Sequence, residues 1–258
     1  MHILLTNDDG IYAPGLRALR QELLSLGRVS VVAPATEQSA VGHSITLLTP
    51  LIVQPVHDVD GSLLGWAVEG KPADCVKLAL VELLDETPDL IVSGINAGSN
   101  VGINVLYSGT VAAAIEGAFF GITSIAVSLE YRDPVQLDFA EAARWARRLI
   151  VQLLEKYRGS GRLFNINIPS LDAGPPKGVR VVPQGIVRYR EQFQRRTDPR
   201  GRVYFWSMPE LVPLQTTPDT DVTALAEGYI TLTPLHFDLT DYRHLETLQR
   251  DFTTPGHR

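Results

Sequence analysis

The chain has 258 residues, of which 45% are hydrophobic, and a formal net charge of −6. This length supports one large core, and the mixed, mildly acidic charge argues against binding to nucleic-acid polymers or to anionic membranes. The single cysteine, Cys75, excludes an intrachain disulfide and a thiolate metal cluster. Because the first residues resemble neither a signal peptide nor a membrane span, we expect a cytoplasmic protein with no membrane partner.

Strand-like and helix-like segments alternate through the first part of the chain. Continuous apolar runs predict strands at 2–6, 29–34, 89–96 and 124–130, with weaker strand-like runs at 51–56 and 63–70. Helical spacing of apolar residues falls between them, at 13–27, 72–84, 108–121 and 138–157. This alternation predicts an α/β fold of the Rossmann-like, three-layer kind, with a mostly parallel sheet between two layers of helices.

The pattern changes after Pro169. Residues 187–206 predict a β-hairpin around an Arg-Thr-Asp-Pro-Arg-Gly turn, and six arginines lie between Arg188 and Arg202. Residues 238–252 predict a C-terminal helix. Because the exposed edges of a long hairpin usually pair or pack on something, the hairpin is either a solvated arm or an oligomerisation arm.

These patterns give one expected domain organisation. We interpret 1–258 as a single domain. Its core, 1–175, would contain the functional site, and 176–258 would form the hairpin arm and a C-terminal oligomerisation segment.

Two adjacent carboxylates, Asp8 and Asp9, directly follow the first apolar run. A single aspartate in this place would indicate a helix cap or an Asp-Gly turn. Two of them repel each other unless a cation lies nearby, and Gly10 permits a turn that lets both reach one ion. Because ligands of α/β sheets bind beyond the carboxyl ends of the strands, the pair favours metal binding over a solvated turn.

A second polar segment, residues 93–117, combines repeated glycines with Asn, Ser and Thr side chains. It follows a predicted buried strand and runs into a predicted helix through Ser108, Gly109 and Thr110. Unpaired N–H groups and the helix dipole make such a loop an anion site, and the two hydroxyl groups add donors. The alternative is a long surface loop whose glycines only permit turns. The density of small polar residues favours a phosphate-binding loop.

Two other segments carry weaker signals. Residues 35–46 contain Ser39 and His43, and by themselves they indicate an ordinary loop. Residues 65–72 have the glycine and lysine spacing of a Walker A loop, but Pro72 occupies the position that requires Ser or Thr for magnesium. The sequence therefore does not support a nucleoside-triphosphatase loop here.

Four segments together resemble the SurE family, the survival-protein-E nucleotidases. They are ILLTNDDG (3–10), APATEQSAVGHSIT (33–46), PADCV (72–76) and SGINAGSNVGINVLYSGTVAAAIEG (93–117). They occur in the family's order over most of the first 130 residues, and the resemblance extends more loosely to FNINIP and the C-terminal helix region. The resemblance implies a metal-dependent phosphatase that releases phosphate from nucleoside 5′- and 3′-monophosphates, and some relatives also act on short polyphosphate.

The resemblance also implies which residues form the site. One divalent ion per subunit, Mg²⁺ or Mn²⁺ (or Ca²⁺ in a crystal), would be held by Asp8, Asp9, Ser39 and Asn96. Catalysis would depend on Asp8, Asp9 and Asn96. Phosphate or substrate would be bound by Asn7, Gly10, Ser39, Asn96, Ser108, Gly109 and Thr110. Oxygen ligands of these kinds suit such ions better than zinc. Direct attack by an aspartate stays open, and we favour water attack assisted by Asp8.

One position departs from the family pattern: Lys71 stands where threonine is usual. This puts any role of that hydroxyl in doubt but leaves the implied metal site intact. Relatives form dimers, often with exchanged C-terminal segments, and assemble further. The resemblance therefore implies a homodimer or homotetramer built through the C-terminal segments.

Three functions are compatible with the same loops. The first, which we favour, is a 5′-nucleotidase. The second is a non-catalytic nucleotide-sensing module, which would bind nucleotides without turnover. The third is primarily an exopolyphosphatase, for which nucleotides would be poor substrates.

Overall fold

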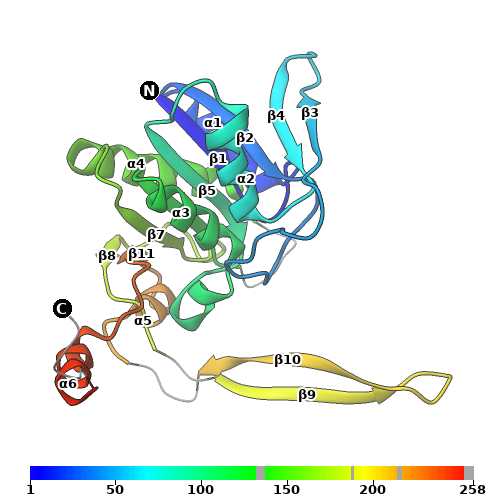
Figure 1. Cartoon of the computed structure of the whole chain (residues 1–258), viewed down its shortest axis with the longest axis vertical. Coiled ribbons are helices and arrows are strands. Elements are labelled where there is room, and N and C mark those ends of the chain that lie inside the picture. Colours follow the sequence, from blue (N-terminus) through cyan, green and yellow to red (C-terminus); the bar gives the residue numbers. More distant parts are fainter. Residues whose placement is uncertain (132–136, 187–188, 214–216, 253–258) are drawn as a thin grey trace.

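A single large sheet forms the centre of the fold (Figure 1). The computed structural model describes residues 1–131, 137–186, 189–213 and 217–252. The nine strands of the sheet are β1 (His2–Thr6), β2 (Arg28–Pro34), β3 (Val53–His57), β4 (Leu63–Val68), β5 (Leu90–Ala97), β6 (Ser124–Leu129), β7 (Leu163–Ile168), β8 (Val179–Val181) and β11 (Ile230–Leu235). Their spatial order is β3-β4-β2-β1-β5-β6-β7-β11-β8.

The middle of the sheet is parallel. Strands β4, β2, β1, β5, β6 and β7 run parallel to their neighbours, whereas β3 and β11 are antiparallel to β4 and β7. From β1 the chain moves to one side through β2, and from β5 it moves to the other side through β6. The strand order therefore reverses between β1 and β5, which is where ligands bind in open α/β sheets. The predicted Rossmann-like α/β fold is confirmed.

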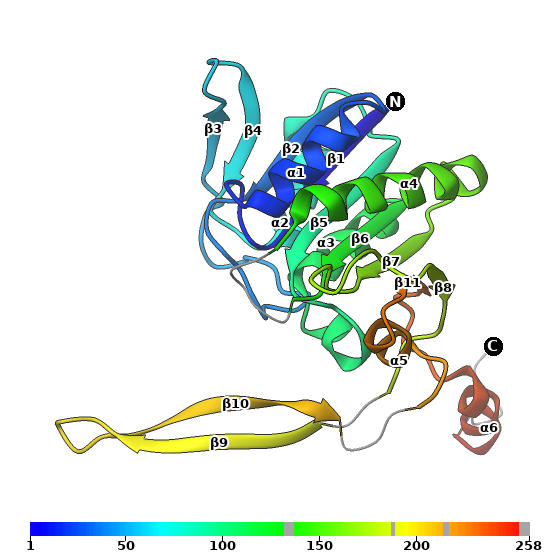
Figure 2. The same ribbon diagram turned by 180° about the vertical axis from the view of Figure 1, so that it is seen from behind.

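Helices cover both faces of this sheet (Figures 1 and 2). Helices α1 (Pro14–Leu23) and α4 (Phe139–Tyr157) pack on each other over one face, and α2 (Pro72–Leu78) and α3 (Gly109–Phe119) lie over the other. Because successive strand residues point to opposite faces, Ile3 of β1 packs in the cluster with α1 and α4, and Leu4 packs with α2 and α3. Burial on both sides explains the continuous apolar run of β1.

Several elements differ from the expected ones. The helix predicted at 72–84 is divided, because a π-helical turn, Ala79–Leu83, follows α2. The segment 176–258 holds more than an arm: it adds β8 and β11 to the sheet and contains a short helix, α5 (Asp221–Ala226). The Walker-like spacing at 65–72 lies mostly on strand β4, in agreement with its rejection.

The hairpin and the C-terminal helix lie apart from the sheet (Figures 1 and 2). Strands β9 (Tyr189–Thr197) and β10 (Val203–Pro213) form the predicted hairpin, and α6 (Tyr242–Phe252) forms the predicted helix. Arg188, the first of the six arginines, lies outside the described residues. Phe205 and Trp206 of β10 are more than half exposed, and α6 has no buried residue. In the part of the chain that the structure describes, every helix is too short or too polar to cross a membrane.

Candidate active site

The two adjacent carboxylates lie at the switch point of the sheet. Asp8 is 4% exposed, and the Thr110 hydroxyl at the start of α3 donates a hydrogen bond to its Oδ1. Asp9 is less buried, and its Oδ2 accepts the backbone N–H of Ala97 at 3.2 Å, at the end of β5. The structure therefore brings the end of β1, the end of β5 and the start of α3 together, as the sequence predicts.

A tight turn aims the two carboxylates. The Asn7 side chain donates to the Gly10 carbonyl at 2.9 Å and accepts the Gly10 N–H at 3.2 Å. Gly10 has a φ of 100°, a conformation that side-chain-bearing residues rarely adopt. In this structure both polar groups of the Asn7 side chain shape the turn, and its assignment to substrate binding stays a prediction.

The first residues of α3 press directly on Asp8. Ser108 is the N-cap, and its Oγ accepts the Val111 N–H at 3.1 Å. A Cβ on Gly109 would lie 2.8 Å from the Asp8 Cβ, so only glycine allows this close approach. The positive end of the helix dipole consequently faces the carboxylate. Of the predicted phosphate-binding residues, Gly109 and Thr110 lie against Asp8, and Ser108 caps the helix.

Burial disfavours negative charge on both aspartates, and repulsion from Asp8 adds to this at Asp9. Burial raises the pKa of Asp8, and hydrogen bonds from the Thr110 hydroxyl and from backbone N–H groups offset part of this rise. Burial, followed by the Asp8 charge, raises the pKa of Asp9 to about 6, and Glu37 adds to the rise. Glu37 was not singled out from the sequence, although it lies two residues before Ser39 in the same loop. The site gathers more negative charge than the sequence motif alone suggests.

The remaining two predicted metal ligands differ in position. The Asn96 side chain donates its Nδ2 hydrogen to the Gly98 carbonyl at 2.7 Å, and within the described residues no hydrogen bond occupies its Oδ1. Ser39 is exposed, and its hydroxyl donates to Glu37 Oε1 at 2.6 Å. No hydrogen bond among the described residues joins Ser39 to Asp8 or Asp9.

The donor set fits one hard divalent cation. A cation would relieve the repulsion that raises the pKa of Asp9, and Asn96 has a carbonyl oxygen to offer. Ser39 would have to exchange its hydrogen bond to Glu37 for the ion. In the described ranges no three His, Cys, Asp or Glu side chains group around one point, so a metal here depends on amide and hydroxyl ligands as well.

Buried polar side chains hold the loop between β5 and α3. The Asn100 N–H donates to Asn167 Oδ1 at 2.7 Å, and its carbonyl accepts Asn165 Nδ2 at 2.8 Å. Asp221 is fully buried and accepts the N–H groups of Gly102 at 2.9 Å and of another loop residue, Gly185, at 2.7 Å. These residues were missed from the sequence, because their partners are more than 35 residues away along the chain.

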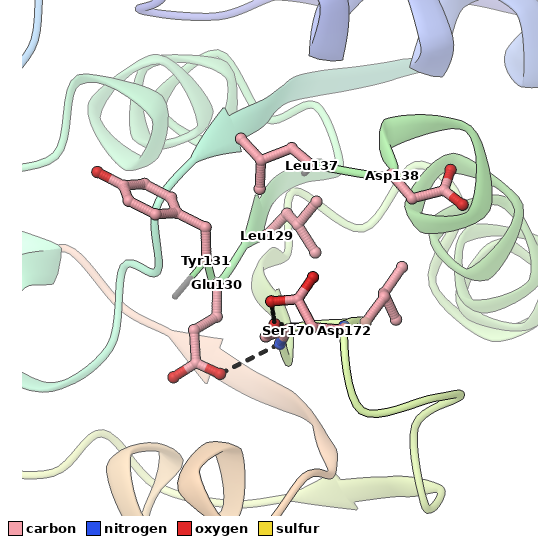
Figure 3. A pocket seen from close by; sticks show the side chains of 8 residues that line it. Leu129, Glu130, Tyr131, Leu137, Asp138, Ser170 and Asp172 are labelled. Carbon is pink, nitrogen blue, oxygen red and sulfur yellow. Dashed lines mark hydrogen bonds between the residues drawn. The ribbon is translucent and has the colours of Figure 1, made fainter. Parts of the chain in front are cut away.

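A second polar hollow lies beyond β6 and does not form a site (Figure 3). It contains three carboxylates, but each already accepts a local hydrogen bond. Glu130 accepts the Ser170 N–H at 3.1 Å, Asp172 accepts the Ser170 hydroxyl at 2.7 Å, and Asp138 caps α4. The space between them does not admit a water molecule.

Comparison with known proteins identifies the family. The model of the family described as survival protein SurE matches residues 3–191. A protein named 5′-nucleotidase SurE from Rhodopirellula baltica is 57% identical over 93% of this chain and 94% of its own length. The chain belongs to the SurE family.

Other SurE relatives support the same assignment along the full chain. The 5′-nucleotidase SurE of Moorella thermoacetica is 48% identical over 99% of this chain and 98% of its own length. The crystal structure of the SurE protein from Aquifex aeolicus superposes with a TM-score of 0.82 at 39% identity, covering 97% of this chain and 99% of that one. The similarity thus includes the hairpin and the C-terminal region that lie beyond the match to the SurE family model.

Proposed function

We propose that this SurE-family chain is a 5′-nucleotidase that hydrolyses nucleoside 5′-monophosphates, and also 3′-monophosphates, to nucleoside and phosphate. The observation that carries the proposal is the contact between Asp8 and the start of α3, which puts a carboxylate against the positive end of a helix at a switch point. The names of the relatives, 5′-nucleotidase SurE, support the same activity.

The proposed enzyme uses one Mg²⁺ or Mn²⁺ ion per subunit, held by Asp8, Asp9, Asn96 and Ser39. When bound, such an ion polarises a phosphoryl oxygen and lowers the pKa of a coordinated water. The raised pKa of Asp9 supports a cation at this point, because the ion offsets the negative charge that Asp8 and Glu37 contribute.

The chain's own residues would bind the phosphate and guide the attacking water. The positive end of the α3 dipole stabilises charge on the phosphoryl oxygens, and the Thr110 hydroxyl would add a donor by exchanging its hydrogen bond to Asp8 for the phosphate. Asp8, our candidate for the assisting carboxylate, orients the water and accepts its proton as the new bond to phosphorus forms. The bond from phosphorus to the nucleoside oxygen breaks, and that oxygen leaves with a proton from solvent.

A phosphate-release panel tests this function. Wild type, Asp9→Asn and the control Asp85→Asn are assayed with nucleoside 5′- and 3′-monophosphates and tripolyphosphate, each with Mg²⁺, Mn²⁺ or chelator. We expect release with metal only, a loss of at least about 100-fold in Asp9→Asn, and wild-type rates in Asp85→Asn, whose side chain is exposed.

Each alternative gives a different result in the same panel. Metal-dependent nucleotide binding without turnover would identify a sensing module. A higher kcat/KM for tripolyphosphate than for any nucleotide would identify an exopolyphosphatase.

We also propose that the protein is a homodimer or homotetramer that exchanges C-terminal segments. The exposed aromatic side chains of β10 and helix α6, which has no buried residue, support this, because exposed apolar patches often mark an interface. Light scattering at micromolar concentration checks the proposal, and a monomeric mass would contradict it.

A further inference from the structure

An open cavity of about 510 Å³ lies beside the candidate active site. Its walls come from the loop after β2 and from the segment that leads into α2, and they include Thr36, Gln38, Thr46 and Lys71. Cavities of this size hold small organic ligands. Nothing in the proposed phosphate chemistry occupies it.

Two contacts connect this cavity to Asp8. The backbone N–H of Gln38 donates to the Asp8 carbonyl at 2.7 Å. Pro72, which directly follows Lys71, lies 3.0 Å from the position of a Cβ on Gly109, and that position is 2.8 Å from the Asp8 Cβ. A substrate whose phosphate lies at the start of α3 therefore has this cavity within reach of its nucleoside portion.

Lys71 lies in the cavity wall and has N–H groups available for a ligand. Its Nζ donates to Gln38 Oε1 at 2.7 Å, and no other acceptor within the described residues is bonded to it, so two of its three N–H groups are free for a ligand. Buried Asp74 fixes the wall, because it accepts the backbone N–H groups of Lys71 at 2.8 Å and of Thr46 at 3.1 Å. The Lys71 backbone is thus held by Asp74, and its ammonium group is held beside Gln38 in the cavity wall.

The chemistry of the walls selects the kind of group that binds. An ammonium only donates, so it recognises an acceptor. Glu69 in the same cavity disfavours a second phosphate group, whereas neutral Thr and Gln side chains suit the edge of a base. Guanine presents two acceptors, O6 and N7, where adenine presents one acceptor and an amino group.

We infer that this cavity binds the base of the substrate nucleotide and that Lys71 makes the enzyme favour 6-oxopurine nucleotides over adenine nucleotides. The inference rests on the proposed nucleotidase function and adds a residue that determines its specificity. Lys71 acts on binding of the base and leaves the phosphoryl step to the residues around Asp8.

The test compares kcat/KM for GMP and AMP in wild type, Lys71→Met and Lys77→Met. Methionine keeps the length of the side chain and removes its charge, and Lys77 lies outside the cavity on α2, the helix that Lys71 precedes. We expect wild type to favour GMP, and Lys71→Met to lose roughly tenfold in kcat/KM for GMP, mainly through KM, with little change for AMP. Lys77→Met should behave as wild type.

Three outcomes would overturn the inference: a wild type without preference for GMP, an equal loss for both nucleotides, or an unchanged ratio in Lys71→Met. Inhibition by the free nucleosides gives a second measurement that does not involve the phosphate. Guanosine should inhibit wild type more strongly than adenosine and lose this advantage in Lys71→Met, and an unchanged advantage would also overturn the inference. If wild type hydrolyses neither nucleotide, the proposed function itself fails.

Discussion

The two sides of the candidate site are built differently. One side, which we call the inner wall, comprises residues 98–110, and the other, the outer wall, comprises residues 36–49. Inner-wall Asn100, Ser108 and Thr110 are buried, and side chains of the sheet and of α5 hold the wall. Outer-wall Glu37 and Ser39 are exposed.

The outer wall is held by contacts to the loop before α3 and to α3 itself. The Gly42 N–H donates to the Tyr107 carbonyl at 2.8 Å, and His43 Nε2 lies 2.7 Å from Glu116 Oε1. A segment that is held by few contacts, and whose hydrogen bonds are exposed to solvent, has low local stability. The difference indicates that the inner wall is the more rigid of the two, whereas Ser39 in the outer wall would have to leave Glu37 to reach a cation.

The largest expected effect is the loss of the inner-wall anchor. Asp221→Ala leaves the N–H groups of Gly102 and Gly185 without their buried acceptor. We expect about 3 kcal/mol less stability toward unfolding by urea, together with reduced phosphate release. Glu227→Ala, at the exposed end of the same helix, is the control and should change stability by less than about 0.5 kcal/mol. Equal stabilities of the two variants would contradict the account in which Asp221 anchors the inner wall.

A methyl group at Gly109 tests the precision of the inner wall. Gly109→Ala places a Cβ 2.8 Å from the Asp8 Cβ, so the carboxylate or the helix must move. Because a misplacement of about 1 Å costs roughly 100-fold in rate, we expect kcat to fall by about that factor while far-UV circular dichroism stays unchanged. A variant with wild-type kcat would show that Asp8 tolerates displacement.

The Asp9 carboxylate makes the stability of the metal-free protein toward unfolding depend on pH. The pKa of Asp9 is about 6 in the folded protein and near 3.8 in the unfolded chain. Between these two pH values the folded state binds more protons than the unfolded state, so stability toward unfolding falls as the pH rises from about 4 to about 6. In chelator, Asp9→Asn should therefore raise Tm by roughly 2–5 °C at pH 7.5 and by almost nothing at pH 4. Added Mg²⁺ or Mn²⁺ should stabilise wild type only. A Tm difference that does not vary with pH would contradict this account.

The smallest expected effect belongs to the outer wall. His43→Gln replaces the imidazole ring and weakens the contact that ties the outer wall to Glu116 on α3. We expect the metal concentration at half-maximal activity to rise about threefold, with kcat and Tm close to wild type, because the glutamine amide can still donate to Glu116 in this partly buried contact. His57→Gln on exposed β3 is the matched control. A large fall in Tm would place His43 among the structural supports and not in an adjustable wall.

Much of the fold follows from local sequence signals, and the exceptions have a common cause. The apolar run at 2–6 and the helical spacing at 138–157 predict β1 and α4 correctly. Strands β7 and β11 were not predicted as part of the sheet. In both, polar residues alternate with apolar ones, as at Asn165 and Thr231. Such alternation usually indicates one face in water, yet both residues are fully buried.

The sequence by itself determined the α/β class, and it predicted that Asp8, Asp9 and Asn96 lie at one edge of the sheet near the loop that contains Ser108, Gly109 and Thr110. These results depend on periodicity and on the direction of parallel strands, which are local properties. Only the tertiary structure decided that Glu37 adds its charge to the site, that Asp221 holds the loop between β5 and α3, and that Lys71 reaches Gln38 in a cavity beside Asp8. Such contacts join residues far apart in the chain, so no short-range pattern encodes them.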